Sequence, residues 1–183
     1  MNKWLNVPNT LSILRIITIP AIVYLIMYTN SSNFPVLVTV YVFSICLDFF
    51  DGYLARKLCQ ETELGKILDP IADKLMVFSL VLVLVARTDF PIWLGVVIVA
   101  RDMVILTASA VIYRGKHVIA SSLLVGKVTF AQLSLLMFIY IIDMSVYIDL
   151  ELLKKFLTPL CFSFIGWSFF EYYKIYIRNK NET

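Results

Sequence analysis

Six apolar runs divide this sequence, each near the length of a membrane-crossing helix, and charged or turn-forming residues separate them. They cover residues 11–29, 34–50, 71–87, 91–113, 121–148 and 156–177. One membrane helix needs about 20 residues, so six of them use most of the 183-residue chain. We therefore expect an all-α integral membrane protein with six transmembrane helices, forming a single domain over residues 1–183.

The composition agrees with a lipid environment and excludes several other classes of protein. Hydrophobic residues make up 60% of the chain and charged residues 16%, whereas soluble domains carry about 25% charged residues. A net charge of only +3 argues against a nucleic-acid partner. Three scattered cysteines and a single histidine predict neither a disulfide framework nor a zinc site.

The N-terminal segment and the basic residues suggest how the chain sits in the membrane. Trp4 and Leu5 before Pro8 predict a short interfacial helix, and Arg15 and Pro20 inside the first run argue against a cleaved signal peptide. With six spans, nine Lys and Arg residues fall on one side and three on the other. By the positive-inside rule both termini are cytoplasmic, and we expect a bacterial inner membrane.

Acidic residues are concentrated in one polar stretch between the second and third runs. Asp48 and Asp51 are three positions apart, and Asp69 and Asp73 are four apart, so each pair projects from one face of a helix. A single aspartate at a helix end is most often a cap or a solvated residue. Four aspartates at these spacings favour a site.

The charge of these four aspartates needs compensation, because an ionised residue at membrane depth costs about 2.5 to 3.5 kcal/mol. Arg56 and Lys74 could offset two of the charges, whereas two divalent cations would offset all four. Carboxylate oxygens suit Mg²⁺ or Mn²⁺. Gly52 and Ala55 leave room for a ligand to approach the backbone. The stretch therefore predicts a two-metal phosphate site on the cytoplasmic side.

The spacing D-x2-D-G-x2-A-R-x8-G-x3-D-x3-D resembles the signature of the CDP-alcohol phosphatidyltransferase family. The residues that match it are Asp48, Asp51, Gly52, Ala55, Arg56, Gly65, Asp69 and Asp73. The resemblance implies a membrane domain of about this length with six helices, an N-terminal interfacial helix and a homodimeric assembly. It also implies transfer of a phosphatidyl or similar group from a CDP-linked donor such as CDP-diacylglycerol to an alcohol, with release of CMP.

The resemblance also implies roles for individual residues. Asp48, Asp51, Asp69 and Asp73 would hold two divalent cations, and Asp73 would also be the general base that takes the proton of the attacking hydroxyl. Gly52, Ala55, Arg56 and Thr62 match positions at the CDP moiety, and Gly65 would permit a tight backbone turn nearby.

The acceptor alcohol is less closely indicated. The stretches NVPNTLSILRIITIP, DGYLARK and LGKILDPIADKL resemble phosphatidylglycerophosphate synthases, and also cardiolipin synthases of the same superfamily; both use glycerol-based acceptors. Glycerol 3-phosphate is our first expectation and phosphatidylglycerol the alternative. The pair Arg101-Asp102 stands where the former group has Arg-Glu, which favours the alternative.

Basic residues inside the apolar runs have two interpretations each. Arg101, helped by Arg114 and Lys127, could bind the phosphate of the acceptor, or Arg101 could pair with Asp102 as a structural element. Arg15 could contact the acceptor or anchor its helix at the membrane interface.

Two hypotheses of other classes compete with a transferase. A small membrane cation transporter would explain carboxylates near a bilayer, but it leaves the Gly-Ala-Arg spacing unexplained and would place its ion site nearer the midplane. A non-catalytic membrane scaffold of the same fold is disfavoured because all four carboxylates are present.

Overall fold

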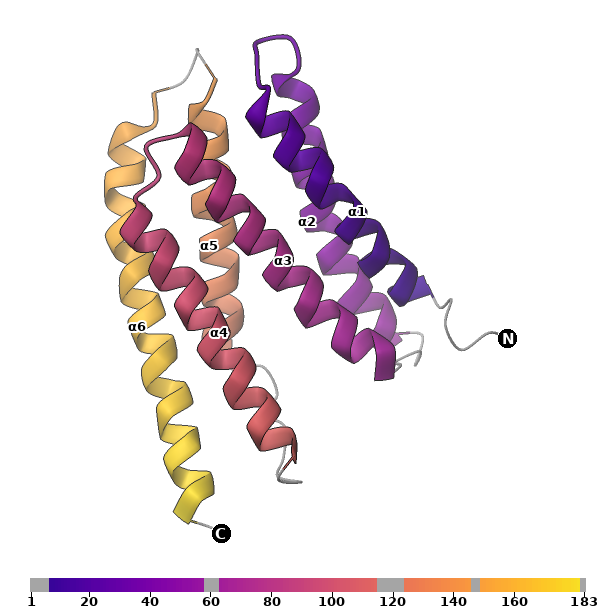
Figure 1. The fold of residues 1–183 in the computed structure, drawn as a ribbon, viewed down its shortest axis with the longest axis vertical. Helices are drawn as coiled ribbons and strands as arrows, with labels where there is room; N and C mark the ends of the chain where they lie inside the picture. Colours follow the sequence, from indigo (N-terminus) through magenta and orange to yellow (C-terminus); the bar gives the residue numbers. More distant parts are fainter. Residues whose placement is uncertain (1–6, 58–62, 115–123, 146–148, 182–183) are drawn as a thin grey trace. The chain divides into compact units, whose positions relative to one another are not determined.

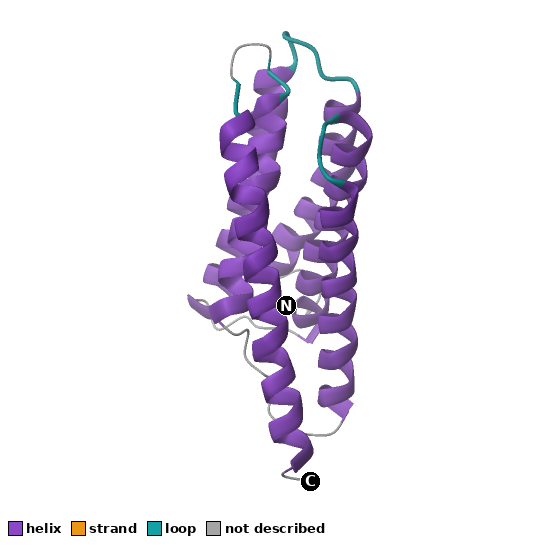
Figure 2. Ribbon diagram, turned by 90° about the vertical axis from the view of Figure 1, so that its left-hand side faces the viewer, coloured by secondary structure: helices purple, strands orange, loops and turns teal. Residues whose placement is uncertain are grey.

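In the part of the chain that the structure describes, the protein consists of six α-helices and no strand (Figures 1 and 2). The structure is a computed structural model and describes residues 7–57, 63–114, 124–145 and 149–181. The helices are α1 (Val7–Met27), α2 (Phe34–Lys57), α3 (Glu63–Arg87), α4 (Ile92–Arg114), α5 (Leu124–Asp143) and α6 (Glu151–Asn181). The predicted interfacial helix around Trp4 lies outside the described residues.

The helices form two compact units. In the first unit, Met1–Thr88 with Met144–Val146, α1 packs against both α2 and α3. In the second unit, Asp89–Asp143 with Tyr147–Thr183, α6 packs against α5 and α4. Each unit has its own apolar core: Ile22, Ile26, Leu37 and Leu84 are buried in the first, and Leu94, Ile98, Leu136 and Ile165 in the second.

Each predicted apolar run coincides with one helix, but the helix ends differ from the ends of the runs. α2 continues to Lys57 and α3 begins at Glu63, so the four aspartates of the polar motif lie on helical turns. A drop in hydropathy marks the end of an apolar segment, but the helix can continue beyond that point.

The fifth run was predicted to extend to residue 148, which is too long. α5 ends at Asp143, whose carboxylate accepts a hydrogen bond from the Leu150 backbone N–H at 3.0 Å. A carboxylate that binds a backbone group beyond its own helix favours a turn over continued helix.

Many large apolar side chains lie on the surface of the helices, and several charged and hydroxyl side chains are buried. Large apolar side chains are exposed on all six helices, for example Ile17, Val36, Leu82, Val96, Leu135 and Phe156. Charged and hydroxyl side chains are buried, among them Arg15, Ser44, Arg101, Asp102, Lys154 and Ser168. Exposed apolar surface on this scale marks contact with another apolar phase or partner.

Within the described ranges, one helix is long and apolar enough to cross a membrane by length and composition, with its window at Thr10–Met27 in α1. Among the described residues, Phe34–Asp48 and Val128–Asp143 are shorter apolar helical segments. α4 is apolar on both sides of Arg101-Asp102, and this pair interrupts it near its middle.

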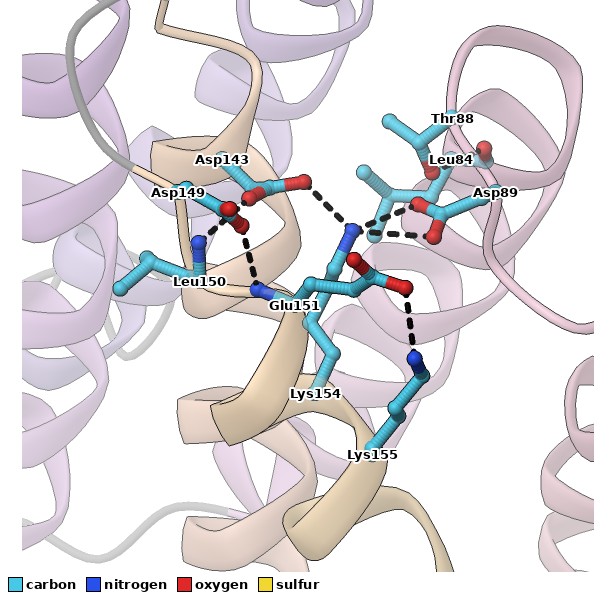
Figure 3. A network of polar contacts seen from close by, with 9 residues as sticks. All are labelled: Leu84, Thr88, Asp89, Asp143, Asp149, Leu150, Glu151, Lys154 and Lys155. Atoms are coloured by element: carbon cyan, nitrogen blue, oxygen red, sulfur yellow. Dashed lines mark hydrogen bonds and ion pairs between the residues drawn. The ribbon is translucent and has the colours of Figure 1, made fainter.

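A buried lysine joins the three helices of the second unit at one end (Figure 3). Lys154, in the first turn of α6, donates to Asp89 just before α4 at 2.9 and 3.0 Å, and to Asp143 at the end of α5 at 2.5 Å. Its ammonium group also lies 5.3 Å from the centre of the Tyr140 ring. This network holds the start of α4, the end of α5 and the start of α6 together.

The network keeps Lys154 charged. Burial alone would lower the pKa of Lys154, but the hydrogen bonds and the charges of Asp143 and Asp89 outweigh it and raise that pKa above its ordinary value. A pKa that is higher in the folded state stabilises the fold below the unfolded-state value of about 10.5. That stability is lost only as the pH rises through the higher folded-state pKa, so the network persists at neutral pH.

Replacing Lys154 by methionine is expected to lower the free energy of unfolding by about 1–3 kcal/mol, because it leaves two carboxylates without their shared donor. The neighbouring Lys155 is the control, since its pair with Glu151 is exposed and four residues apart on the same helix. Lys155→Met should cost about 0.3–0.5 kcal/mol. Thermal unfolding in detergent micelles at pH 7 measures both, and equal losses would contradict the structural role of Lys154.

Candidate functional site

Two aspartates of the acidic motif meet at one arginine in the first unit. A terminal nitrogen of Arg15 in α1 forms an ion pair with Asp48 of α2 and lies 2.9 Å from an oxygen of Asp73 of α3. Arg15 is 1% exposed, whereas the side chains of Asp48 and Asp73 are 30% and 27% exposed. We call these three residues the Arg15 cluster. The first and last aspartates of the motif are therefore neighbours in space.

The position of Arg15 explains why the cluster forms. Arg15 lies within the apolar window of α1, and α1 packs against both α2 and α3 (Figure 1). A cation buried in such a helix needs anionic partners. The carboxylates of the two neighbouring helices supply them, and their partial exposure leaves one side of each accessible.

A polar layer lies one helical turn from the cluster on each of the three helices. The hydroxyl oxygens of Thr18 in α1 and Ser44 in α2 are 3.0 Å apart, and Ser44 donates to the sulfur of Met76 in α3 at 3.4 Å. Thr18 also donates to the backbone carbonyl of Arg15 at 2.6 Å. Contacts of this kind between apolar helices fix how the helices align along their length, so the layer holds the cluster in register.

The other residues of the motif are placed only by their backbone. Asp51, Gly52, Ala55 and Arg56 lie in the last turns of α2, and Gly65 and Asp69 lie near the start of α3, but their side chains are outside the described part. Thr62 lies outside the described residues altogether.

The structure supports the helical premise of the motif. α2 runs without a break through Asp48 and Asp51, and α3 through Asp69 and Asp73, so each pair lies on a continuous helix as the spacing predicts. Gly65 belongs to the first turn of α3, so its own backbone is helical.

A metal site is not complete within the described residues, where no three Asp, Glu, His or Cys side chains are grouped closely enough to hold an ion. Two of the four predicted ligands, Asp51 and Asp69, are outside that description. The two ligands that are described converge on one cation, Arg15.

Arg101 lies in the buried interior of the second unit. It donates to the carboxylate of Asp102 at 2.7 Å and to the hydroxyl of Ser168 in α6 at 3.0 Å. The structural pairing that the sequence allowed is therefore present, and the role of Arg101 at an acceptor phosphate stays a prediction. The other two predicted acceptor residues, Arg114 at the end of α4 and Lys127 in the first turn of α5, have side chains outside the described part.

Arg15 is the residue of the cluster to which the sequence interpretation assigned a different place. We expected Arg56 and Lys74 to offset the aspartates and Arg15 to anchor its helix at the interface or to contact the acceptor. The burial of Arg15 excludes a solvent-facing anchor. The signal was an arginine inside an apolar run, which needs a partner, but the sequence does not say which carboxylates lie beside it.

The fold and the cluster together define an all-helical protein with apolar outer faces and a carboxylate site at the meeting of three helices. The family model of CDP-alcohol phosphatidyltransferases matches residues 5–167. The chain belongs to the CDP-alcohol phosphatidyltransferase family, as its motif predicted.

Several curated relatives carry names for a specific transfer. The chain is 38% identical over 104 residues to the CDP-diacylglycerol–glycerol-3-phosphate 3-phosphatidyltransferase of Pseudomonas fluorescens, covering 55% of this chain and 53% of that protein. It is 31% identical over 141 residues to the protein of the same name in Bacillus subtilis, covering 70% and 72%. It is also 36% identical over 101 residues to a Mycobacterium bovis protein with the provisional name cardiolipin synthase, covering 55% and 47%. The chain thus spans about half the length of the first of these relatives.

Proposed function

We propose that the protein transfers the phosphatidyl group of CDP-diacylglycerol to a glycerol-based acceptor, with glycerol 3-phosphate as the first choice, and releases CMP. The observation that carries the proposal is the convergence of Asp48 and Asp73, the two ends of the family motif, on one buried cation. The names of the Pseudomonas and Bacillus relatives support the choice of donor and acceptor.

The residues present fit a pair of divalent cations. Asp48 and Asp73 offer carboxylate oxygens, which are the ligands that Mg²⁺ and Mn²⁺ prefer. Asp51 and Asp69 share helices with them and would complete the set of four ligands. When bound, such cations stabilise negative charge on the phosphates during an in-line displacement.

The chain's own residues account for binding and proton transfer. Asp73 accepts the proton of the acceptor hydroxyl, whose oxygen forms a bond to the phosphatidyl phosphorus while the bond from that phosphorus to CMP breaks. A carboxylate base of this kind contributes about 10²- to 10⁴-fold to the rate. Arg56 forks onto phosphate oxygens of the donor, with Gly52, Ala55, Thr62 and Gly65 near the nucleotide. Arg101, Arg114 and Lys127 bind the acceptor phosphate.

A membrane location follows from the surface of the helices. Large apolar side chains are exposed on every helix while Arg15, Arg101 and Asp102 are buried, as expected where lipid replaces water. We propose that all six helices cross the bilayer of a bacterial inner membrane, with both termini and the site on the cytoplasmic side. In this arrangement the acyl chains of CDP-diacylglycerol remain in lipid while its nucleotide reaches the aspartates. The active form is proposed to be a homodimer.

A cardiolipin synthase-type reaction, with phosphatidylglycerol as acceptor, is the second candidate. The pair Arg101-Asp102 and the provisional name of the Mycobacterium relative favour it. The cation transporter is set aside, because the family match covers residues 5–167 and includes the whole motif.

We expect purified protein with CDP-diacylglycerol and Mg²⁺ or Mn²⁺ to release CMP when glycerol 3-phosphate is added, and excess EDTA to stop the release. Phosphatidylglycerol, serine and inositol phosphate are assayed in parallel. Release with phosphatidylglycerol alone would assign the second candidate. No release with any of the four acceptors would contradict a transferase of this kind.

Two conservative variants separate the proton acceptor from the ligands that bind the donor. Asp73→Asn should abolish turnover, because the amide cannot take the proton, while leaving nucleotide binding largely intact. Asp48→Asn should weaken the metal-dependent binding of the nucleotide itself. CMP release and equilibrium binding of CDP measure the two effects. Equal turnover in Asp73→Asn and wild type would remove Asp73 as the base.

Arg101→Lys tests the acceptor site, because lysine keeps the charge but loses the planar fork. We expect the KM for glycerol 3-phosphate to rise about tenfold, equivalent to about 1.4 kcal/mol, with the KM for CDP-diacylglycerol unchanged. Ser168→Ala is the control, since it removes the α6 partner and keeps the arginine. If both variants lower the melting temperature alike and leave both KM values unchanged, Arg101 serves only packing between α4 and α6.

A further inference from the structure

Arg15 is among the largest fully buried side chains of the described residues, and it lies in the α1 window that is long and apolar enough to cross a membrane. Its charge is balanced by carboxylates that belong to the family motif, Asp48 and Asp73, on two different helices. An arginine that faced lipid or the interface would extend to water instead. Arg15 is thus part of the site, although it lies outside the motif.

We propose that Arg15 is a positioning residue: it holds the two ends of the acidic motif together before divalent cations bind, and it competes with those cations for the carboxylate oxygens. The inference rests on the proposed function, because it assigns Asp48 and Asp73 as ligands.

Charge balance explains the first part of this role. Without a cation between them, two partly buried carboxylates on neighbouring helices repel each other, and like charges in a medium of low dielectric separate the groups that carry them. Arg15 pairs with both and replaces that repulsion by attraction. In this proposal Arg15 holds α2 and α3 together at the cluster, so cation binding does not have to do so.

The second part follows from the same contacts. A divalent cation that binds Asp48 or Asp73 takes oxygens that Arg15 contacts, and it enters a site next to a fixed positive charge. Both effects weaken cation binding. The polar layer of Thr18, Ser44 and Met76 joins α1 to α2 and α3 one turn away, so the backbone of Arg15 stays beside the two carboxylates. Arg15 therefore holds the carboxylates in place and, by the same contacts, lowers their affinity for divalent cations.

The test uses the full-length protein in detergent micelles, stripped of metals, with Mn²⁺ as the probe. Arg15→Gln should lower the metal-free melting temperature by about 2–8 °C. It should also bind Mn²⁺ about tenfold more tightly than wild type, since a nearby unit charge repels a divalent ion even in water. Saturating Mn²⁺ should therefore raise its melting temperature more than that of wild type. Calorimetric titration and thermal unfolding measure these quantities without any turnover.

Two further variants keep the test decisive. Arg15→Lys retains the charge but reaches less far and cannot fork, so it should lie between wild type and Arg15→Gln in both quantities. If Arg15→Gln does not fold, Arg15→Lys alone is compared with wild type. Thr18→Val removes the hydroxyl of the polar layer and leaves the charge. It should lower the melting temperature with and without Mn²⁺ and leave the Mn²⁺ affinity unchanged.

The outcomes separate this inference from the proposed function. If wild type binds Mn²⁺ and releases CMP, but Arg15→Gln or Arg15→Lys binds Mn²⁺ no more tightly, the inference is overturned and the proposed function stands. If wild type binds no Mn²⁺ and Asp48→Asn behaves identically, the metal site of the proposed function is overturned and the inference fails with it.

Discussion

A guanidinium group buried between apolar helices is stable only beside carboxylates, and this constraint organises the first unit of the protein. Arg15 lies inside α1, and the charge of this one residue draws Asp48 of α2 and Asp73 of α3 to the same place. The hydroxyl and thioether contacts one turn away hold the three helices in the alignment that this pairing requires. The packing of α1 against α2 and α3 therefore brings the residues of the cluster together, and the charge of Arg15 favours this packing over others.

The number, order and approximate positions of the helices follow from the alternation of apolar runs with polar breaks, which is strong in this sequence. Helix ends were harder to predict, because they depend on hydrogen bonds with residues further along the chain. α5 stops at Asp143 because its carboxylate binds Leu150 and Lys154. α2 continues past its apolar run to Lys57, and no proline stands between Asp51 and Lys57 to end it earlier.

The spacing of the aspartates was enough to predict which residues share a helix face, and the family match confirms the motif they belong to. It could not predict the partner of those residues. Arg56 and Lys74 are near them in sequence, whereas Arg15 is more than thirty positions before Asp48. Proximity between helices is a property of tertiary packing, and no local pattern in α1 identifies α2 and α3 as its neighbours.

Lys154 and Arg15 each pair with two carboxylates. We interpret the Lys154 network as structural and the Arg15 cluster as the candidate site. One oxygen of Asp143 accepts a hydrogen bond from the Leu150 backbone. Lys154 binds Asp89 and Asp143 and so holds the ends of three helices together. Asp48 and Asp73 instead lie within continuous helices that also contain the other two motif aspartates, Asp51 and Asp69. One arginine neutralises at most one of those four charges. The divalent cations of the proposed function would balance the negative charge that Arg15 leaves uncompensated.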